Sequence, residues 1–284
     1  MLTRRQLQGP TWRRLLRDVY ADARLPVDHG LFIAAAQLVI PPGVAIAGRS
    51  AAWLRGADQL IDAVDPVQVL VRRAERFGPV AGLRIVTAND VPTTDVESDR
   101  GVLLTTPGRT ATDVARWSKD LVEAVVALDA MLAAGAVRPN QLAAAVAALS
   151  VGHRHHTAMR AASLSDGRSE SPQETRLRVR LVLAGLPAPV PQFEVRHLGR
   201  FLARVDLAYP ARKLAIEYDG AWHAAPGQLA RDRQRLNRLV GAGWRVIHVT
   251  ATDLYDDRII GTIRTALLAG GMSGESTSAR TGTR

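Results

Sequence analysis

The chain has 284 residues, a formal net charge of +10 and no cysteine. Its length allows two domains with separate cores. The absence of cysteine excludes disulfides and thiolate metal sites. No uninterrupted apolar run reaches the roughly 20 residues that a membrane helix needs, and the N-terminal residues lack the apolar stretch of a secretory signal. We therefore expect a cytoplasmic protein with no segment in a membrane.

The excess of positive charge is concentrated toward the C-terminus. Residues 166–284 contain 18 basic and 12 acidic side chains, so they carry +6 of the net +10. Such an excess attracts polyanions, which favours DNA as a partner. The alternative is that an arginine-rich composition makes many surfaces basic whatever the ligand.

Residues 1–165 are expected to form a mixed domain of helices and short strands. A short helix is predicted at residues 2–8, and an apolar helical run at 31–40 stops at two prolines. Strands are predicted at 67–71, 83–86 and 101–106, and further helices at 121–134 and 139–149. Thr106 and Pro107 suit the start of another helix, where Arg109 indicates either a phosphate site or an ordinary cap.

Two N-terminal segments resemble parts of the abortive-infection type IV antitoxins. In the first, residues 11–23, basic residues precede Val19-Tyr20-Ala21-Asp22, as at the end of a winged-helix element. The second is residues 47–56, with the sequence AGRSAAWLRG. The resemblance implies a truncated winged helix in a DNA-binding, antitoxin-like domain, with a cognate toxin or another defence protein as partner. A purely structural packing role is the alternative for both segments.

A polar, turn-prone segment, Asp166 to Pro172, marks a domain boundary. Residues 166–270 are expected to form a second domain in the order helix, three strands, helix, strand, helix. Residues 271–284 have too little apolar content to fold, which predicts a disordered tail. The fold class is therefore α/β, of the α+β kind.

The second domain contains two short apolar segments that carry acids, residues 203–209 and 213–219. A strand places Glu217 and Asp219 on the same face. A turn of three residues between the segments suits an antiparallel hairpin, which brings Asp206 near Glu217. Converging carboxylates repel one another and lose solvation, so a divalent cation would stabilise them. Pairing of each acid with a nearby arginine is the alternative.

The sequence from Asp206 through Glu217-Tyr218-Asp219-Gly220 to His223 resembles the PD-(D/E)XK, restriction-endonuclease-like superfamily, in particular its very-short-patch-repair-endonuclease-like group. The resemblance implies an αβββαβ core in which Asp206, Glu217 and Asp219 hold Mg²⁺ or Mn²⁺ for phosphodiester hydrolysis in double-stranded DNA. The residues that it assigns to the catalytic site are Glu174, Asp206, Glu217, Asp219, His223, Arg231 and Arg235.

Several of these assignments leave alternatives open. Glu174 is either the additional acid of that family or part of a capping box with Ser171. His223 is a ligand, a general acid or a surface residue. The family's lysine is absent, and Asp219 occupies its position. Any cationic helper must then be protonated His223 or one of Arg231 and Arg235, and an arginine cannot act as a base at neutral pH.

The sequence therefore predicts a metal-dependent DNA endonuclease or nickase, acting in DNA repair or phage defence. The alternative is a non-catalytic, DNA-binding transcriptional regulator or antitoxin of a type IV toxin–antitoxin system.

Overall fold

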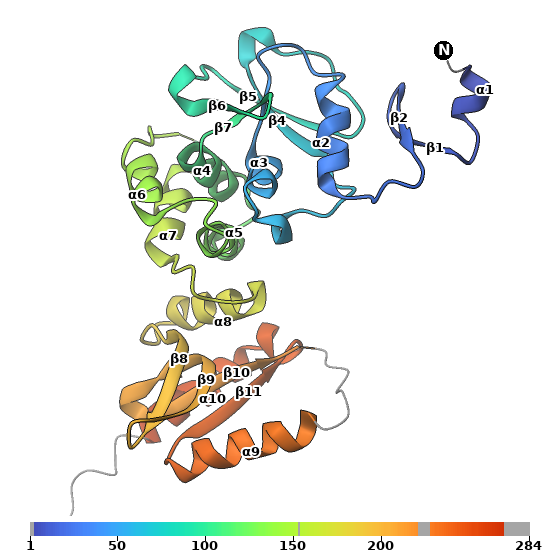
Figure 1. The fold of residues 1–284 in the computed structure, drawn as a ribbon. Helices are drawn as coiled ribbons and strands as arrows, with labels where there is room; N and C mark the ends of the chain where they lie inside the picture. Colours follow the sequence, from blue (N-terminus) through green and yellow to red (C-terminus); the bar gives the residue numbers. More distant parts are fainter. Residues whose placement is uncertain (1–2, 153, 221–227, 270–284) are drawn as a thin grey trace, which may run out of the picture. The chain divides into compact units, whose positions relative to one another are not determined.

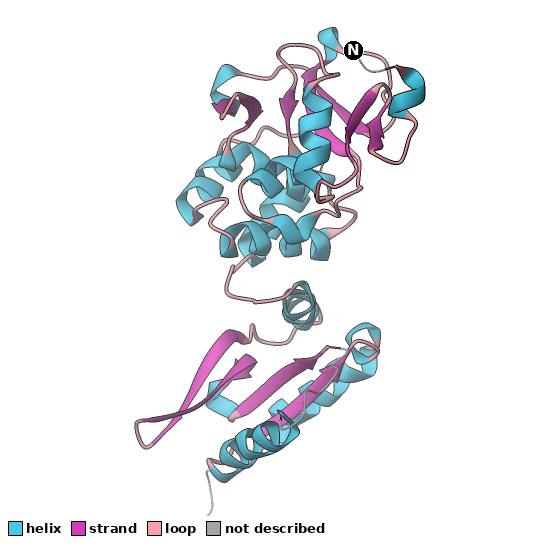
Figure 2. Cartoon of the chain, turned by 45° about the vertical axis from the view of Figure 1, so that its right-hand side comes forward, coloured by secondary structure: helices cyan, strands magenta, loops and turns pink. Residues whose placement is uncertain are grey.

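The structure is a computed structural model that describes residues 3–152, 154–220 and 228–269. The chain divides into two compact units, unit 1 (Met1–Gly167) and unit 2 (Arg168–Arg284). Helices and three sheets occur among the described residues, which confirms the α+β class (Figures 1 and 2). The tail predicted at residues 271–284 lies outside the described residues.

Unit 1 contains a five-stranded sheet with the strand order β5-β4-β3-β7-β6. The strands are β3 (Ala45–Ile46), β4 (Val67–Arg72), β5 (Leu83–Ala88), β6 (Val96–Asp99) and β7 (Val102–Thr105). The three strands predicted from the sequence are β4, β5 and β7. Strand β3 is only two residues long, and β6 has the sequence VESD, so neither carries the apolar pattern that identifies a strand.

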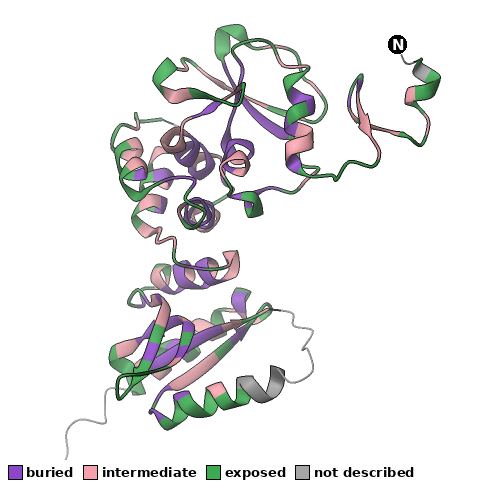
Figure 3. Cartoon of the chain, viewed as in Figure 1, coloured by how far each residue is buried: buried purple, intermediate pink, exposed green. Residues whose placement is uncertain are grey.

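Helices pack beside this sheet and against one another. They are α2 (His29–Gln37), α3 (Gly48–Leu54), α4 (Pro107–Trp117), α5 (Leu121–Ala133), α6 (Pro139–Ala147) and α7 (His155–Leu164), with 3-10 turns at Asp58–Leu60, Arg73–Glu75 and Thr93–Asp95. Figure 3 shows that α5 is buried over most of its length. Helix α2 begins at His29 because the Asp28 carboxylate accepts a hydrogen bond from the Leu31 N–H, at 2.8 Å.

Helix α5 offers a direct test of capping. The Asp120 carboxylate accepts a hydrogen bond from the Glu123 N–H, at 2.9 Å. We expect Asp120→Ala to lower the free energy of unfolding of unit 1 by about 1 kcal/mol, because a helix N–H loses its acceptor. Urea unfolding of the full chain measures the change, with Asp58→Ala as the control, since Asp58 is exposed and caps no helix. An equal loss in both variants would contradict the prediction.

The N-terminal residues of unit 1 form helix α1 (Arg4–Leu7) and a β-hairpin of β1 (Trp12–Leu16) and β2 (Val19–Asp22). The predicted helix at 2–8 corresponds to the shorter α1. Asp18 has a φ of 61° in the tight turn between the strands. Leu16 and Val19 belong to the same hydrophobic cluster as Ile33 of α2 and Val69 of β4. The hairpin is therefore anchored to unit 1 by its apolar side chains.

Unit 2 contains a four-stranded sheet with the strand order β11-β10-β9-β8. Its elements are α8 (Pro172–Leu183), β8 (Val190–His197), β9 (Arg200–Tyr209), the 3-10 turn Pro210–Arg212, β10 (Leu214–Asp219), α9 (Gln228–Gly241), β11 (Arg245–Thr250), the 3-10 turn Asp253–Tyr255 and α10 (Asp257–Ala269). Strands β8, β9 and β10 are antiparallel neighbours, whereas β10 and β11 are parallel and α9 connects them. The predicted order of helix, three strands, helix, strand and helix is present, with α10 as the last helix.

The two faces of β10 contact different helices. Leu214 and Ile216 belong to a cluster that includes Leu177 of α8 and Ile263 of α10. Ala215 belongs to a second cluster, which includes Leu239 of α9. The strict alternation along β10 therefore directs Glu217, two residues after Ala215, toward the face that α9 covers.

Candidate functional site

The central feature of unit 2 is a break in the backbone pairing at Asp206. Strands β9 and β10 pair from Leu214 with Tyr209 to Ile216 with Leu207, and the ladder ends there. The next residues in the two strands are Glu217 and Asp206. Asp206 Oδ2 accepts a hydrogen bond from the Tyr218 N–H, at 2.8 Å, so a side chain takes the place of the next backbone acceptor.

The pairing of β9 with β8 is interrupted at the same level. Pro191 pairs with Leu207 and Phe193 with Val205, but Gln192 between them has a φ of 51° and is not paired with Asp206. A left-handed conformation is uncommon for a residue with a side chain. Asp206 therefore lacks a paired residue on both neighbouring strands, and we call this interruption of the ladder the opening in the sheet.

Three carboxylates gather at this opening, and we call Glu174, Asp206 and Glu217 the acid cluster. The pKa of Asp206 is raised to about 6, and burial is the main cause. The charges of Glu174 and Glu217 contribute to the increase, while the Tyr218 N–H and Arg235 oppose it. Glu174 and Glu217 are themselves 7% and 5% exposed. The ionised form of Asp206 is therefore disfavoured by its surroundings.

Glu217 is paired with Arg235 of α9. Arg235 Nη1 donates to Glu217 Oε1, at 2.7 Å, and Arg235 Nη2 donates to the other oxygen. The Glu217 side chain is 7% exposed and the Arg235 side chain is 35% exposed. These two parallel hydrogen bonds compensate the negative charge of the Glu217 carboxylate, which is the more buried of the two groups. Two of the residues predicted for the site are thus each other's partners.

Glu174 caps helix α8, which is one of the two roles that the sequence left open. The Ser171 hydroxyl accepts from the Glu174 N–H, at 3.2 Å, and donates to Glu174 Oε1, at 2.8 Å, as in a helix cap. Glu174 Oε2 accepts from Gln192 Nε2, at 2.8 Å. The same carboxylate is close enough to raise the pKa of Asp206. Gln192 was not predicted, because no local pattern in the sequence reveals its left-handed backbone.

The other predicted residues lie elsewhere or outside the described part. Asp219 Oδ2 lies 3.0 Å from His248 Nδ1 on β11, in a pair that is about half exposed. His248 was also not predicted. His223 lies outside the described residues, and Arg231 belongs to α9 but its side chain is outside them.

The acid cluster suits a hard divalent cation in its donor atoms, because carboxylate oxygens are the ligands that Mg²⁺ prefers. Within residues 3–152, 154–220 and 228–269, however, no group of three His, Asp or Glu side chains is arranged to hold one metal ion. Glu217 is engaged by Arg235. Among the described residues, Asp206 could therefore act as a metal ligand. Glu217 could do so only after its ion pair with Arg235 has separated.

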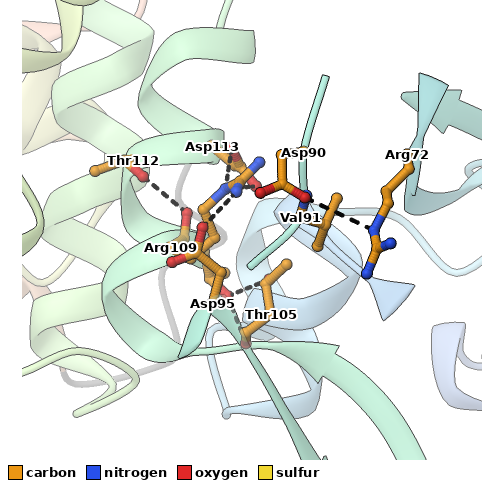
Figure 4. Close-up of polar contacts among 9 residues, drawn as sticks. Arg72, Asp90, Val91, Asp95, Thr105, Arg109, Thr112 and Asp113 are labelled. Atoms are coloured by element: carbon orange, nitrogen blue, oxygen red, sulfur yellow. Dashed lines mark hydrogen bonds and ion pairs between the residues drawn. The ribbon is translucent and has the colours of Figure 1, made fainter. Parts of the chain in front are cut away.

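Unit 1 contains a second buried charge network, at the start of α4 (Figure 4). Arg109 lies between Asp95, at 2.8 Å, and Asp113, at 3.0 Å. Asp113 is almost fully buried, and burial raises its pKa to about 6 although Arg109 opposes the shift. Because two carboxylates already engage Arg109, the phosphate site considered for this helix start is not supported, and Arg109 has a structural role.

Comparison with known proteins shows that part of unit 1 is similar to a protein family. Residues 44–166 match the AbiEi antitoxin C-terminal domain. Two uncharacterized proteins from two strains of Mycobacterium tuberculosis are each 35% identical to this chain over 156 residues. The aligned part is 54% of this chain and 57% of each relative, so the chain spans little more than half the length of the curated relatives that it matches.

No solved structure gives a significant match. None of these comparisons supports the resemblance of unit 2 to the restriction endonucleases. None of the described helices is long and apolar enough to span a bilayer. The family likeness is thus to an antitoxin domain, and it covers the five-stranded sheet and helices α3 to α7 of unit 1.

Proposed function

We propose that the chain is an antitoxin-type, DNA-binding regulator in which unit 1 is the antitoxin-like part. The observation that carries this proposal is the match of residues 44–166 to the AbiEi antitoxin C-terminal domain. The net charge of +10 supports DNA as a ligand. An antitoxin implies a toxin, so a toxin encoded beside this chain is the partner that the proposal adds.

The hairpin β1–β2 is the element that we propose for contact with DNA. Arg13 and Arg14 donate to backbone carbonyls of the N-terminal residues, which holds their guanidinium groups against the hairpin. Arg17 lies in the turn with a side chain that is 84% exposed, and its ion partner is the equally exposed Asp18, at 3.7 Å. Such a weak pair leaves Arg17 available for a phosphate.

Binding of the full chain to the duplex upstream of its own gene tests this role. We expect Arg17→Ala to reduce the slope of log K against log salt concentration by about 0.9, because one phosphate contact is lost. Arg76→Ala is the matched control, since Arg76 is an exposed arginine of unit 1 outside the hairpin. An unchanged slope for Arg17→Ala, or no preference of the wild type for its own upstream duplex over an unrelated one, would contradict the proposal.

We also propose a second function, metal-dependent phosphodiester hydrolysis by unit 2, which the position of Asp206 at the opening in the sheet supports. A divalent cation held by Asp206 and Glu217 would lower the pKa of a bound water and polarise a phosphate. Asp206 serves as a ligand only when it is ionised. Cation binding is therefore expected to strengthen as the pH rises through about 6.

Incubation of the full chain with supercoiled plasmid and Mg²⁺ or Mn²⁺ tests the second function. Asp206→Ala and Glu217→Ala are expected to abolish nicking. Equal nicking by all three proteins, or none by the wild type, would remove it. Salt-sensitive DNA binding that does not depend on the divalent cation would leave the regulator function standing alone.

A further inference from the structure

Unit 1 contains a pocket of about 470 Å³, which we call the basic pocket, lined by Arg49 of α3, Arg84 of β5 and Lys119 just after α4, together with Trp117. Its volume is in the range of sites for small organic ligands. All of its lining residues lie between positions 49 and 123, inside the segment that matches the antitoxin domain.

Among the residues that the structure describes, none of the three cations of the basic pocket forms an ion pair with an acid. Arg49 is half-buried, whereas Arg84 and Lys119 are exposed. The half-buried Arg55 and Arg109 of unit 1 are paired, Arg55 with Glu97 and Arg109 with two aspartates. Three cations in one concave site repel one another unless an anion compensates them. With the two acids of its lining, Asp65 and Glu123, the basic pocket has a formal excess of one positive charge, which an external anion would compensate.

The cationic groups of the pocket are positioned by their neighbours. Arg49 Nη1 donates to the Leu60 carbonyl, at 3.2 Å. The Arg84 guanidinium lies 5.9 Å from the centre of the Trp117 ring, within the range of a cation–π contact. On Gly48 a Cβ atom would lie 2.5 Å from that ring, so the backbone of α3 packs closely against it. Trp117 thereby orients Arg84 and is itself held in place.

Two acids, Asp65 and Glu123, also line the basic pocket. Carboxylates repel a bare anion, but they accept hydrogen bonds from sugar hydroxyls and from the amino groups of bases. A nucleotide site combines three kinds of group. Cations bind the phosphates, the plane of an arginine stacks on the base, and carboxylates accept hydrogen bonds from the sugar or the base. A simple inorganic anion would interact only with the cations.

We propose that the basic pocket binds a nucleotide, with its phosphates on Arg49, Arg84 and Lys119. The nucleotide is either a free nucleoside polyphosphate or one unit of a single-stranded nucleic acid, since both present the same phosphate, sugar and base. This site goes beyond the proposed function, because neither the hairpin nor the acid cluster contributes to it.

Titration calorimetry of the full chain with ATP, GTP and an eight-nucleotide single strand, each in turn, tests the proposal. We expect saturable binding of at least one of them, with a Kd of about 1 mM or tighter. The double variant Arg84→Ala/Lys119→Ala should bind at least about tenfold more weakly, because two charge-assisted contacts are removed. Binding of free nucleotides identifies a soluble ligand, and binding of the strand alone identifies a nucleic acid.

The matched control is Arg73→Ala/Arg76→Ala, which removes two exposed charges from the same unit outside the pocket. Lys119→Gln alters one exposed side chain and serves as the test if the double variant does not fold. The proposal is overturned if none of the three ligands binds, or if the pocket variants and the control bind with equal affinity. Because promoter binding and plasmid nicking are separate measurements, either can succeed when this one fails.

Discussion

Replacing Arg235 by alanine is expected to lower the free energy of unfolding of unit 2 by about 3 kcal/mol. The reason is that Glu217 remains at a buried position, with its carboxylate 7% exposed and both of its guanidinium hydrogen bonds removed. A buried charge without a partner costs far more than a surface ion pair contributes. The partial exposure of Arg235 places the expected loss at the lower end of the range for buried pairs.

Urea unfolding of the full chain, followed by tryptophan fluorescence, measures this loss. Arg238→Ala is the matched control, because Arg238 lies on the same helix and is exposed. The double variant Glu217→Gln/Arg235→Ala should recover part of the stability, since no ionised group then remains buried. A loss for Arg235→Ala no larger than for Arg238→Ala would show that the pair does not stabilise unit 2.

Asp206→Asn is expected to change activity and stability in opposite directions. The amide cannot act as an anionic metal ligand, so the metal-dependent nicking proposed for unit 2 should fall by at least about 100-fold. The Asn oxygen can still accept the Tyr218 N–H. The pKa of Asp206 in the folded protein is raised from 3.8 to about 6, so the wild type loses stability between these two pH values and remains destabilised above them. The variant avoids this penalty.

Thermal unfolding between pH 4 and pH 8 tests the stability half of the prediction. Near pH 4 Asp206 is protonated in the folded wild type, and the difference between the two proteins should be small. As the pH rises from about 4 to about 6, the unfolded chain loses the Asp206 proton while the folded wild type keeps it, so the wild type loses stability and the variant should become the more stable one. Above about pH 6 the difference should stay constant. Glu194→Gln is the control, because Glu194 is an exposed acid of β8 outside the acid cluster. A variant less stable than the wild type at pH 8 would contradict the raised pKa.

The sequence predicts the local features that repeat along the chain. Alternation along 214–219 correctly separates Glu217 from Ile216 on opposite faces, and the prolines after residue 40 mark where the preceding helix must have ended. These features depend on neighbours within a few residues, which the sequence displays directly.

The sequence cannot predict features that depend on distant residues or on unusual backbone angles. Gln192 reaches Glu174 because its φ is 51°, and His248 reaches Asp219 because β10 and β11 pair in one particular register. The short strand β3 exists only because β4 and β7 flank it. Partners of this kind are set by tertiary packing, which overrides local propensity.

The antitoxin claim is tested most directly by growth rescue. Cells that are arrested by the product of a gene flanking this one should resume growth when the full chain is co-expressed. The Asp206→Ala chain should rescue them equally well, because the antitoxin-like part is unit 1 and Asp206 belongs to unit 2. Arrest that persists at full expression of the chain, or rescue that is lost with Asp206→Ala, would contradict the account.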